Sequence, residues 1–207
     1  MTDPAIRAAA TVVLWRSHRD TQQVLMGMRG AQAVFMPSKY VFPGGGVDPQ
    51  DHQGHASGSG DLYLTPSCRQ RLALHCDTIA PSADTLCRTA LRETAEETGL
   101  NFVTPSPGTM QFIFRAITPP GRSRRFDARF FLANVASVGG DTTGFSVASG
   151  ELSHLHWIGV DAARNLDLPF ITEVVLAEVG AILRGHPQPG VPFFDNSGPV
   201  PMFRRLD

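Results

Sequence analysis

Residues 92–100 read RETAEETGL, and this short stretch carries more information than any other part of the chain. On a helix, Glu93, Glu96 and Glu97 stand at positions i, i+3 and i+4, so one helical face presents three carboxylates. Like charges at these spacings destabilise an isolated helix. A bound divalent cation would remove that cost, and hard oxygen ligands suit Mg²⁺ or Mn²⁺. Taken alone, the same residues also fit a solvated acidic face, which is common on helices.

The composition makes this acidic cluster stand out. The chain has 207 residues, with 18 Lys+Arg against 19 Asp+Glu, and only six of the acids are Glu. Its net charge of −1 argues against a general nucleic-acid-binding protein, which usually has a basic excess. No apolar run approaches the roughly 20 residues that span a bilayer, and the N-terminal residues contain no apolar signal core. We therefore expect a cytoplasmic protein with neither nucleic-acid nor membrane partners.

Patterns along the chain predict strands and helices in mixed order. Ser82 and Gly99 are the N-cap and C′ residues expected for a helix over 83–98. Other expected elements are a hairpin of 8–15 and 23–28, strands at 111–117, 129–135 and 154–158, and helices at 66–76, 161–165 and 169–183. Residues 186–207 contain five prolines and predict an irregular tail. This mixture predicts one domain over residues 1–207, with a mixed sheet and helices on both faces.

A glycine-rich turn, FPGG at residues 42–45, lies upstream of the carboxylate helix. Together the two features resemble the Nudix hydrolase family, whose box reads G-x5-E-x7-R-E-U-x-E-E-x-G-U, where U is apolar. The second half of the box matches residues 92–100, with Thr94 at the first U position. The first half matches residues 45–51, with Asp51 in place of the expected Glu.

The two halves are separated by extra sequence. Arg92 follows Gly45 by 47 positions instead of the 14 of the motif, a surplus of 33 residues. Asp51, counted forward from Gly45, and Asp84, counted back from Arg92, both fall on the first acidic position of the box. An insertion at about residues 52–83 would produce this spacing, and the count leaves open which Asp takes the position.

The resemblance implies an α/β (α+β) fold, a Nudix-type α/β/α sandwich around a mixed sheet with an inserted helical lid. It implies an Mg²⁺-dependent hydrolase, with Mn²⁺ as a substitute, that cleaves the diphosphate of a nucleoside diphosphate-X substrate by attack of water on phosphorus. Glu93, Glu96, Glu97 and the backbone carbonyl of Gly44 would bind metal, and Arg92 would orient Glu93.

The substrate implied by the resemblance is less defined. Interrupted boxes occur in a branch that includes a peroxisomal coenzyme A diphosphatase, and residues 125–132 (RFDARFFL) resemble that branch. The His and Gly-Gln signature of coenzyme A enzymes is absent before the glycine turn. Coenzyme A or its esters, a nucleotide sugar and a dinucleotide therefore stand together as candidate substrates.

The resemblance also requires a general base, which contributes roughly 10²–10⁴-fold to a rate. Box glutamates such as Glu97 serve in some members, and a Glu on a later loop serves in others. Glu151, after a glycine-rich loop, is the candidate outside the box, and a solvated carboxylate is its alternative reading. Arg125, at the end of the basic loop of residues 119–125, and Arg129, on the strand predicted at 129–135, are candidate substrate-binding residues; a solvated loop and a pair with Asp127 are their alternative readings.

The insertion is too long for a passive connection. Its polar, glycine-rich residues 52–64 predict a loop, and we expect a lid or specificity element, or else a contact in a homodimer. It also holds potential zinc ligands with unusual spacing, namely His52, His55, Cys68, His75 and Cys76. Two other readings therefore remain: a zinc-stabilised interaction module, and a non-catalytic Nudix-like nucleotide sensor, whose expected mark is a damaged box.

Overall fold

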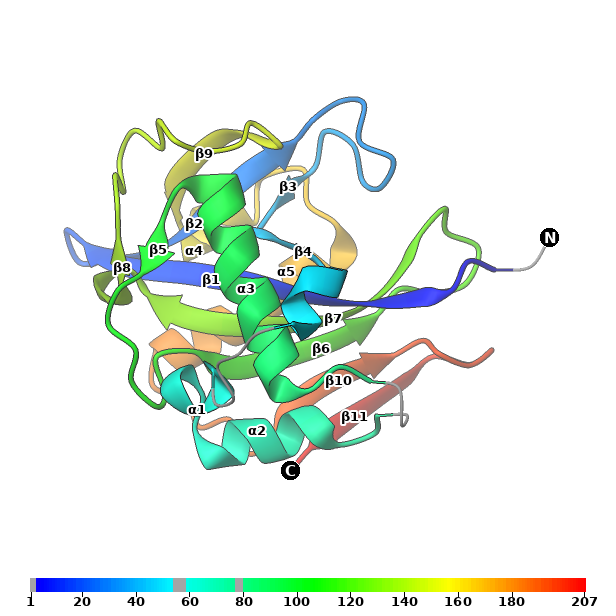
Figure 1. The fold of residues 1–207 in the computed structure, drawn as a ribbon. Coiled ribbons are helices and arrows are strands. Elements are labelled where there is room, and N and C mark those ends of the chain that lie inside the picture. The colour runs from blue at the N-terminus through cyan, green and yellow to red at the C-terminus, as the bar shows by residue number, and fades with distance from the viewer. Residues whose placement is uncertain (1–2, 54–58, 77–79) are drawn as a thin grey trace.

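A computed structural model describes residues 3–53, 59–76 and 80–207 (Figure 1). Its centre is a nine-stranded mixed sheet with the order β11-β10-β6-β7-β1-β2-β3, in which β4 also pairs with β1 and β9 with β2. The strands are β1 (Ile6–His18), β2 (Thr21–Arg29), β3 (Tyr40–Val41), β4 (Gly44–Gly46), β6 (Gln111–Ile117), β7 (Arg125–Asn134), β9 (Leu152–Gly159), β10 (Val191–Asp195) and β11 (Met202–Leu206). The long β1 and β7 run parallel to each other and form the middle of the sheet.

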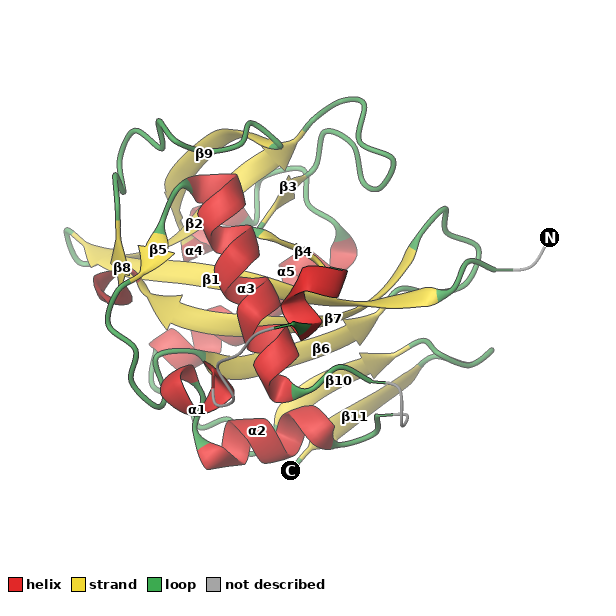
Figure 2. Ribbon diagram, in the orientation of Figure 1, coloured by secondary structure: helices red, strands yellow, loops and turns green. Residues whose placement is uncertain are grey.

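Helices cover both faces of this sheet (Figure 2). Helix α3 (Ala83–Thr98) lies across one face, with α1 (Ser59–Tyr63) and α2 (Pro66–Ala73) beside its N-terminal end (Figure 1). Helices α4 (Val160–Ala163) and α5 (Phe170–Leu183) cover the other face. Two 3-10 turns, η1 (Pro49–His52) and η2 (Val135–Ser137), and a small sheet of β5 (Asn101–Phe102) and β8 (Val138–Gly139) complete the fold.

Each face of the sheet has its own hydrophobic core. Neighbouring residues of β1 point to opposite faces, so Val12 joins the core under α3 and Val13 joins the core under α5. The first core includes Leu86 and Ala90 of α3, and the second includes Val175 of α5. The predicted mixed α/β sandwich is therefore confirmed.

Several elements match their sequence predictions closely. The Thr85 amide donates to the Ser82 side chain at the start of α3, and Gly99 ends the helix in the left-handed region at φ 75°. The hairpin β1–β2, strands β6, β7 and β9 and helices α2, α4 and α5 all occur within a few residues of their expected bounds. The predicted loop at 52–64 includes α1 and extends over residues 54–58, which lie outside the described residues.

The irregular tail predicted for residues 186–207 is wrong. Strand β10 pairs parallel with β6, and β11 pairs antiparallel with β10 and extends the sheet. Val191, Phe193 and Leu206 are buried in the core below α3, and this burial stabilises the two strands despite the nearby prolines. Among the described residues, no helix has the length and apolar character needed to cross a membrane.

Candidate active site

Three consecutive glycines bring strand β4 into close contact with helix α3. The strand pairs antiparallel with β1, where Gly45 lies opposite Ala10. A Cβ atom at Gly45 would lie 2.3 Å from Oε1 of Glu93, a distance that real Cβ contacts do not show. The missing side chain therefore allows the Glu93 carboxylate to pack directly against the strand backbone.

Glu97, one turn further along α3, is held by the same strand. Its Oε2 accepts a hydrogen bond of 2.7 Å from the backbone N–H of Gly44, and the residue is almost completely buried. Burial raises the pKa of the Glu97 carboxyl to about 8, although the bond from Gly44 opposes this shift. Burial also raises the pKa of Glu93, against the attraction of Arg92. Two carboxylates are thus desolvated side by side.

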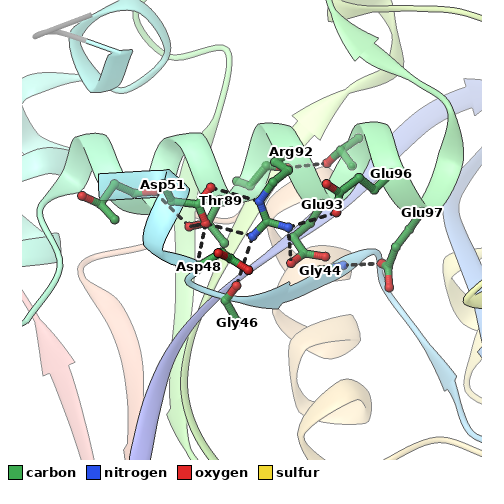
Figure 3. Close-up of polar contacts among 12 residues, drawn as sticks. Gly44, Gly46, Asp48, Asp51, Thr89, Arg92, Glu93, Glu96 and Glu97 are labelled. Carbon is green, nitrogen blue, oxygen red and sulfur yellow. Dashed lines mark hydrogen bonds and ion pairs between the residues drawn. The ribbon is translucent and has the colours of Figure 1, made fainter. Parts of the chain in front are cut away.

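Arg92 joins the helix to the glycine strand (Figure 3). Its Nη1 donates to Glu93 Oε1 at 2.8 Å and to Glu96 Oε2 at 3.0 Å. Its Nη2 donates to the carbonyl of Gly46 at 3.1 Å and to Asp51 Oδ2 at 2.8 Å, while Nε donates to Asp51 Oδ1 at 3.0 Å. One guanidinium group therefore fixes two carboxylates of the helix and the loop that follows β4.

Asp51 is the acidic partner that receives the two-point contact. It is 3% exposed, and it also accepts hydrogen bonds from the Asp48 backbone and the Thr89 hydroxyl, each at 2.9 Å. Burial works against its charge, but the bonds from Arg92, Asp48 and Thr89 together keep the pKa of Asp51 below its ordinary value.

Asp84 lies in a different environment. Its Oδ1 accepts from the Gly60 backbone at 2.7 Å and from Arg69 Nη1 at 2.9 Å, so it anchors α1 and α2 of the insertion to α3. Of the two positions allowed by counting, Asp51 is the one that contacts Arg92.

A cavity of about 400 Å³ is lined by β4 and by carboxylates of α3. Its lining includes Gly44, Glu93, Glu97 and Glu151, which come from three separate parts of the chain. Glu96 does not line it; that carboxylate turns toward Arg92, with half of its side chain exposed. The cavity thus combines buried carboxylates with a space of ligand size.

Comparison with known proteins matches this geometry. No protein-family model matches the chain. A crystal structure of a NUDIX hydrolase from Alicyclobacillus acidocaldarius is 25% identical, covers 84% of this chain and 90% of its own, and superimposes with a TM-score of 0.61. The fold is that of the Nudix hydrolases.

Two further proteins are similar to this chain. The Caenorhabditis elegans protein described as nudix hydrolase 7 is 26% identical over 162 residues, which are 73% of this chain and 51% of the relative. The chain thus spans about half the length of that relative. The NUDIX domain of Shewanella oneidensis NrtR, solved in complex with ADP ribose, is 15% identical with a TM-score of 0.53, covering 87% of this chain and 90% of its own.

The carboxylates that line the cavity fit a hard divalent cation. Glu93 and Glu97 present carboxylate oxygens to the cavity beside the backbone of Gly44, and burial without a cation raises the pKa of both. Oxygen donors of this kind suit Mg²⁺. Among the described residues, however, no group of three or more His, Cys, Asp or Glu converges as a metal cluster. Glu96 accepts a hydrogen bond from Arg92 instead of facing the cavity.

The structure corrects the interpretation of Arg125 and Arg129. Neither lines the cavity. Arg125 is buried and donates to the carbonyls of Thr118 and Asn196, while Arg129 is fully buried and pairs with Asp127. Strand alternation explains the second error, since Ala128 and Phe130 face the cavity and Arg129 must point to the opposite face.

Other arginines, which sequence reasoning did not select as site residues, line the cavity: Arg7, Arg29 and Arg124. Arg124 belongs to the basic loop before β7, but Arg7 and Arg29 come from β1 and β2 and have no motif around them. A pair of aromatic rings, Phe35 and Phe126, lines the same cavity with centroids 5.3 Å apart.

The described part of the insertion does not form a lid. None of residues 59–76 lines the cavity, and Leu64, Cys68 and Leu72 are buried in the core beneath α3. The zinc interpretation gains no support: His55 lies outside the described residues, and the described ones hold no cluster of three or more potential ligands. The insertion instead extends the hydrophobic core at the N-terminal end of α3.

Proposed function

We propose that this chain is an Mg²⁺-dependent Nudix hydrolase that cleaves the diphosphate linkage of a nucleoside diphosphate-X substrate. The observation that carries the proposal is the clamp of Arg92 on Asp51 and Glu93. This clamp holds the carboxylate helix against the glycine strand, so that Glu93 and Glu97 reach a cavity of about 400 Å³. An acidic helix face without a function would not need two desolvated carboxylates beside a cavity.

Glu93, Glu97 and the carbonyl of Gly44 would hold the cation, with Glu96 as a further ligand on the same helix face. When bound, Mg²⁺ neutralises phosphate oxygens and makes a water molecule more acidic. Arg92 acts as a positioning residue, because its contacts with Asp51 and Gly46 restrict where Glu93 can point.

Glu151 is the proposed general base. It lines the cavity, and its charge raises the pKa of both Glu93 and Glu97, although less than their burial does. It is exposed, so it retains the mobility to approach a water molecule next to the substrate. In this role it accepts the proton that the attacking water loses as the bond to phosphorus forms.

The substrate class rests on the similar proteins. A structure of an Ap4A hydrolase from Caenorhabditis elegans, 16% identical with a TM-score of 0.51, shares the fold, as does the NrtR domain in complex with ADP ribose. We take nucleotides with a diphosphate or longer bridge as the substrates to test first, together with coenzyme A and its esters.

The decisive experiment is a screen of the purified protein with Mg²⁺ against ADP-ribose, NADH, coenzyme A, dinucleoside polyphosphates and nucleoside triphosphates. We expect Glu97→Gln to lower kcat/KM on the best substrate by about 10³-fold, because the substitution removes a charged metal ligand. Glu173→Gln, an exposed glutamate on α5, is the matched control and should stay within about twofold of wild type.

Hydrolysis that is equal in wild type and Glu97→Gln would contradict the proposed site. If the wild type binds nucleotides with Mg²⁺ but hydrolyses none, the non-catalytic sensor replaces the enzyme. Isothermal titration with ADP-ribose separates this outcome from a protein that binds no nucleotide at all.

A further inference from the structure

The cavity is lined by positive side chains as well as by carboxylates. The side chains of Arg7, Arg29 and Arg124 line it, and within residues 3–53, 59–76 and 80–207 none of their guanidinium groups forms an ion pair or a hydrogen bond. The Nε of Arg29 is buried without a hydrogen-bond partner. Arg7 and Arg124 are exposed and Arg29 is half-buried, and cationic donors that line a cavity without protein partners are suited to an anionic ligand.

These arginines differ in where they lie. Arg29 lies near Glu97, since its positive charge acts to lower the pKa of that carboxyl. Arg7 lies on β1 directly opposite Phe126 of β7, and Arg124 precedes Phe126 by two residues. A Cβ atom at Gly46 would lie 3.4 Å from Arg7 Nη2 and 3.8 Å from Phe126 Cε1. Arg7, Arg124 and the aromatic pair therefore form one wall.

The two loops next to this wall contact each other. The Ser123 hydroxyl donates to the carbonyl of Val34 at 3.2 Å, which connects the loop between β6 and β7 to the loop between β2 and β3. The rings of Phe35 and Phe126 meet edge to face, with 66° between their planes. Such rings offer an apolar surface on which a nucleobase packs, and the two arginines lie beside that surface.

The number of positive charges exceeds what the scissile diphosphate requires. On the proposed function, the cation and Arg29 neutralise the diphosphate next to Glu93 and Glu97. Arg7 and Arg124 remain, on the wall that holds the base. Arg7 and Arg124 both line the cavity next to Phe126 or its strand, and a phosphate group accepts charge-assisted hydrogen bonds from guanidinium groups.

We propose that Arg7 and Arg124 bind a phosphate group on the ribose of the substrate's nucleoside, in addition to the scissile diphosphate, while the base packs on Phe35 and Phe126. This inference rests on the proposed function for the identity of the reaction. It assigns a substrate class to the cavity: nucleoside diphosphate derivatives that carry a 2′- or 3′-phosphate.

Binding of product-like nucleotides tests the inference without catalysis. Isothermal titration of the full chain should show adenosine 3′,5′-bisphosphate or adenosine 2′,5′-bisphosphate binding about 10–100-fold more tightly than adenosine 5′-monophosphate, as expected for a charge-assisted contact. The preference should shrink with added salt. Equal affinity for all three nucleotides would overturn the proposal.

Variants test whether Arg7 and Arg124 are the side chains that bind the ribose phosphate. The double substitution Arg7→Gln/Arg124→Gln should reduce the preference for the bisphosphate to about twofold or less. Arg122→Gln is the matched control, because Arg122 lies on the same loop, is exposed and does not line the cavity; it should keep the preference. A preference that survives the double substitution, or that Arg122→Gln abolishes, would overturn the assignment to these side chains. Unchanged thermal midpoints confirm that the variants are folded.

Hydrolysis of matched substrate pairs separates the inference from the proposed function. NADPH and NADH differ by a 2′-phosphate, and coenzyme A and dephospho-coenzyme A differ by a 3′-phosphate. Preferential cleavage of the phosphorylated member of either pair supports both proposals. Equal cleavage of both members in both pairs refutes the inference and keeps the hydrolase. No cleavage of these compounds or of any other substrate in the screen, with the bisphosphate preference retained, refutes the hydrolase and keeps the anion-binding wall.

Discussion

Asp51 and Asp84 lie on opposite sides of the insertion, and each stands at the spacing of the first acidic residue of the box. Their surroundings differ completely. Asp51 is 3% exposed and receives two bonds from Arg92, one from Thr89 and one from the Asp48 backbone. Asp84 is less buried and contacts Arg69 and the backbone of Gly60. Asp51 belongs to the contacts by which Arg92 joins α3 to the loop after β4, called the junction below, and Asp84 to the anchor of the insertion.

This difference shows how a motif can be interrupted without losing its geometry. The loop after β4 and the helix α3 need not be connected by a short link, because Arg92 and Arg88 bind both the side chain and the carbonyl of Asp51. The insertion leaves the chain at η1 and returns at the N-cap Ser82 of α3. Side-chain contacts, rather than chain connectivity, therefore hold the two halves of the box together.

The largest effect is expected from breaking the junction with Asp51→Asn. Removing one partner of a buried ion pair leaves Arg92 partly uncompensated and costs about 3 kcal/mol of unfolding free energy. Release of Arg92 also frees Glu93, and such misplacement lowers kcat/KM by about 10²-fold. Urea denaturation and steady-state kinetics on the best substrate measure the two effects.

Asp84→Asn is the matched control for this prediction. The Arg69–Asp84 pair is partly exposed, so its loss costs less than about 1 kcal/mol and leaves kcat/KM within about twofold. If Asp84→Asn lost as much activity as Asp51→Asn, the insertion would take part in the reaction and the distinction between the two residues would fail.

The sequence predicts the local structure of helix α3 better than it predicts which distant residue contacts Arg92. The caps of α3 and the spacing of Glu93, Glu96 and Glu97 are local patterns, and the helix follows them. The choice between Asp51 and Asp84 depends on a contact across 41 residues, between Asp51 and Arg92, which no local pattern contains. Counting therefore leaves both possibilities open, and only tertiary structure separates them.

The sequence predicts even less well which arginines face the cavity. Arg129 carries a charge and still lies fully buried on the face away from the cavity, because Asp127 pairs with it there. Arg7 has no recognisable motif, yet the parallel register of β1 and β7 places it beside Phe126. Pairing between distant strands decides both positions. Composition and periodicity do not contain that information.

A second prediction concerns the role of the insertion in stability. Leu72 on α2 is 4% exposed and belongs to the core under α3, so Leu72→Ala should cost about 2–4 kcal/mol of unfolding free energy through lost burial and a cavity. At a temperature where the variant remains folded, kcat/KM should stay within about twofold of wild type, because residues 59–76 do not line the active-site cavity.

The control for this second comparison is Leu62→Ala on α1. Leu62 is 51% exposed, so its truncation should change the unfolding free energy by less than about 0.5 kcal/mol. Thermal and urea unfolding of the two variants measure the contrast. A Leu72→Ala variant of wild-type stability but altered KM would mean that the insertion acts as a specificity element after all.

The smallest effect on stability among the three test substitutions is expected from Gly45→Ala, which changes the glycine strand on the other side of the junction. The new Cβ atom would lie 2.3 Å from Oε1 of Glu93, so the carboxylate must move aside, although the side chain is flexible and the cost in stability should stay within about 1 kcal/mol. Displacement of a proposed metal ligand should lower kcat/KM by about 10-fold and raise the Mg²⁺ concentration at half-maximal rate.

Gly30→Ala is the control, since no atom lies within 4 Å of a Cβ at that position. If Gly45→Ala kept the wild-type rate and Mg²⁺ dependence, close packing of Glu93 on the glycine strand would not matter for catalysis, and the clamp would act on stability alone.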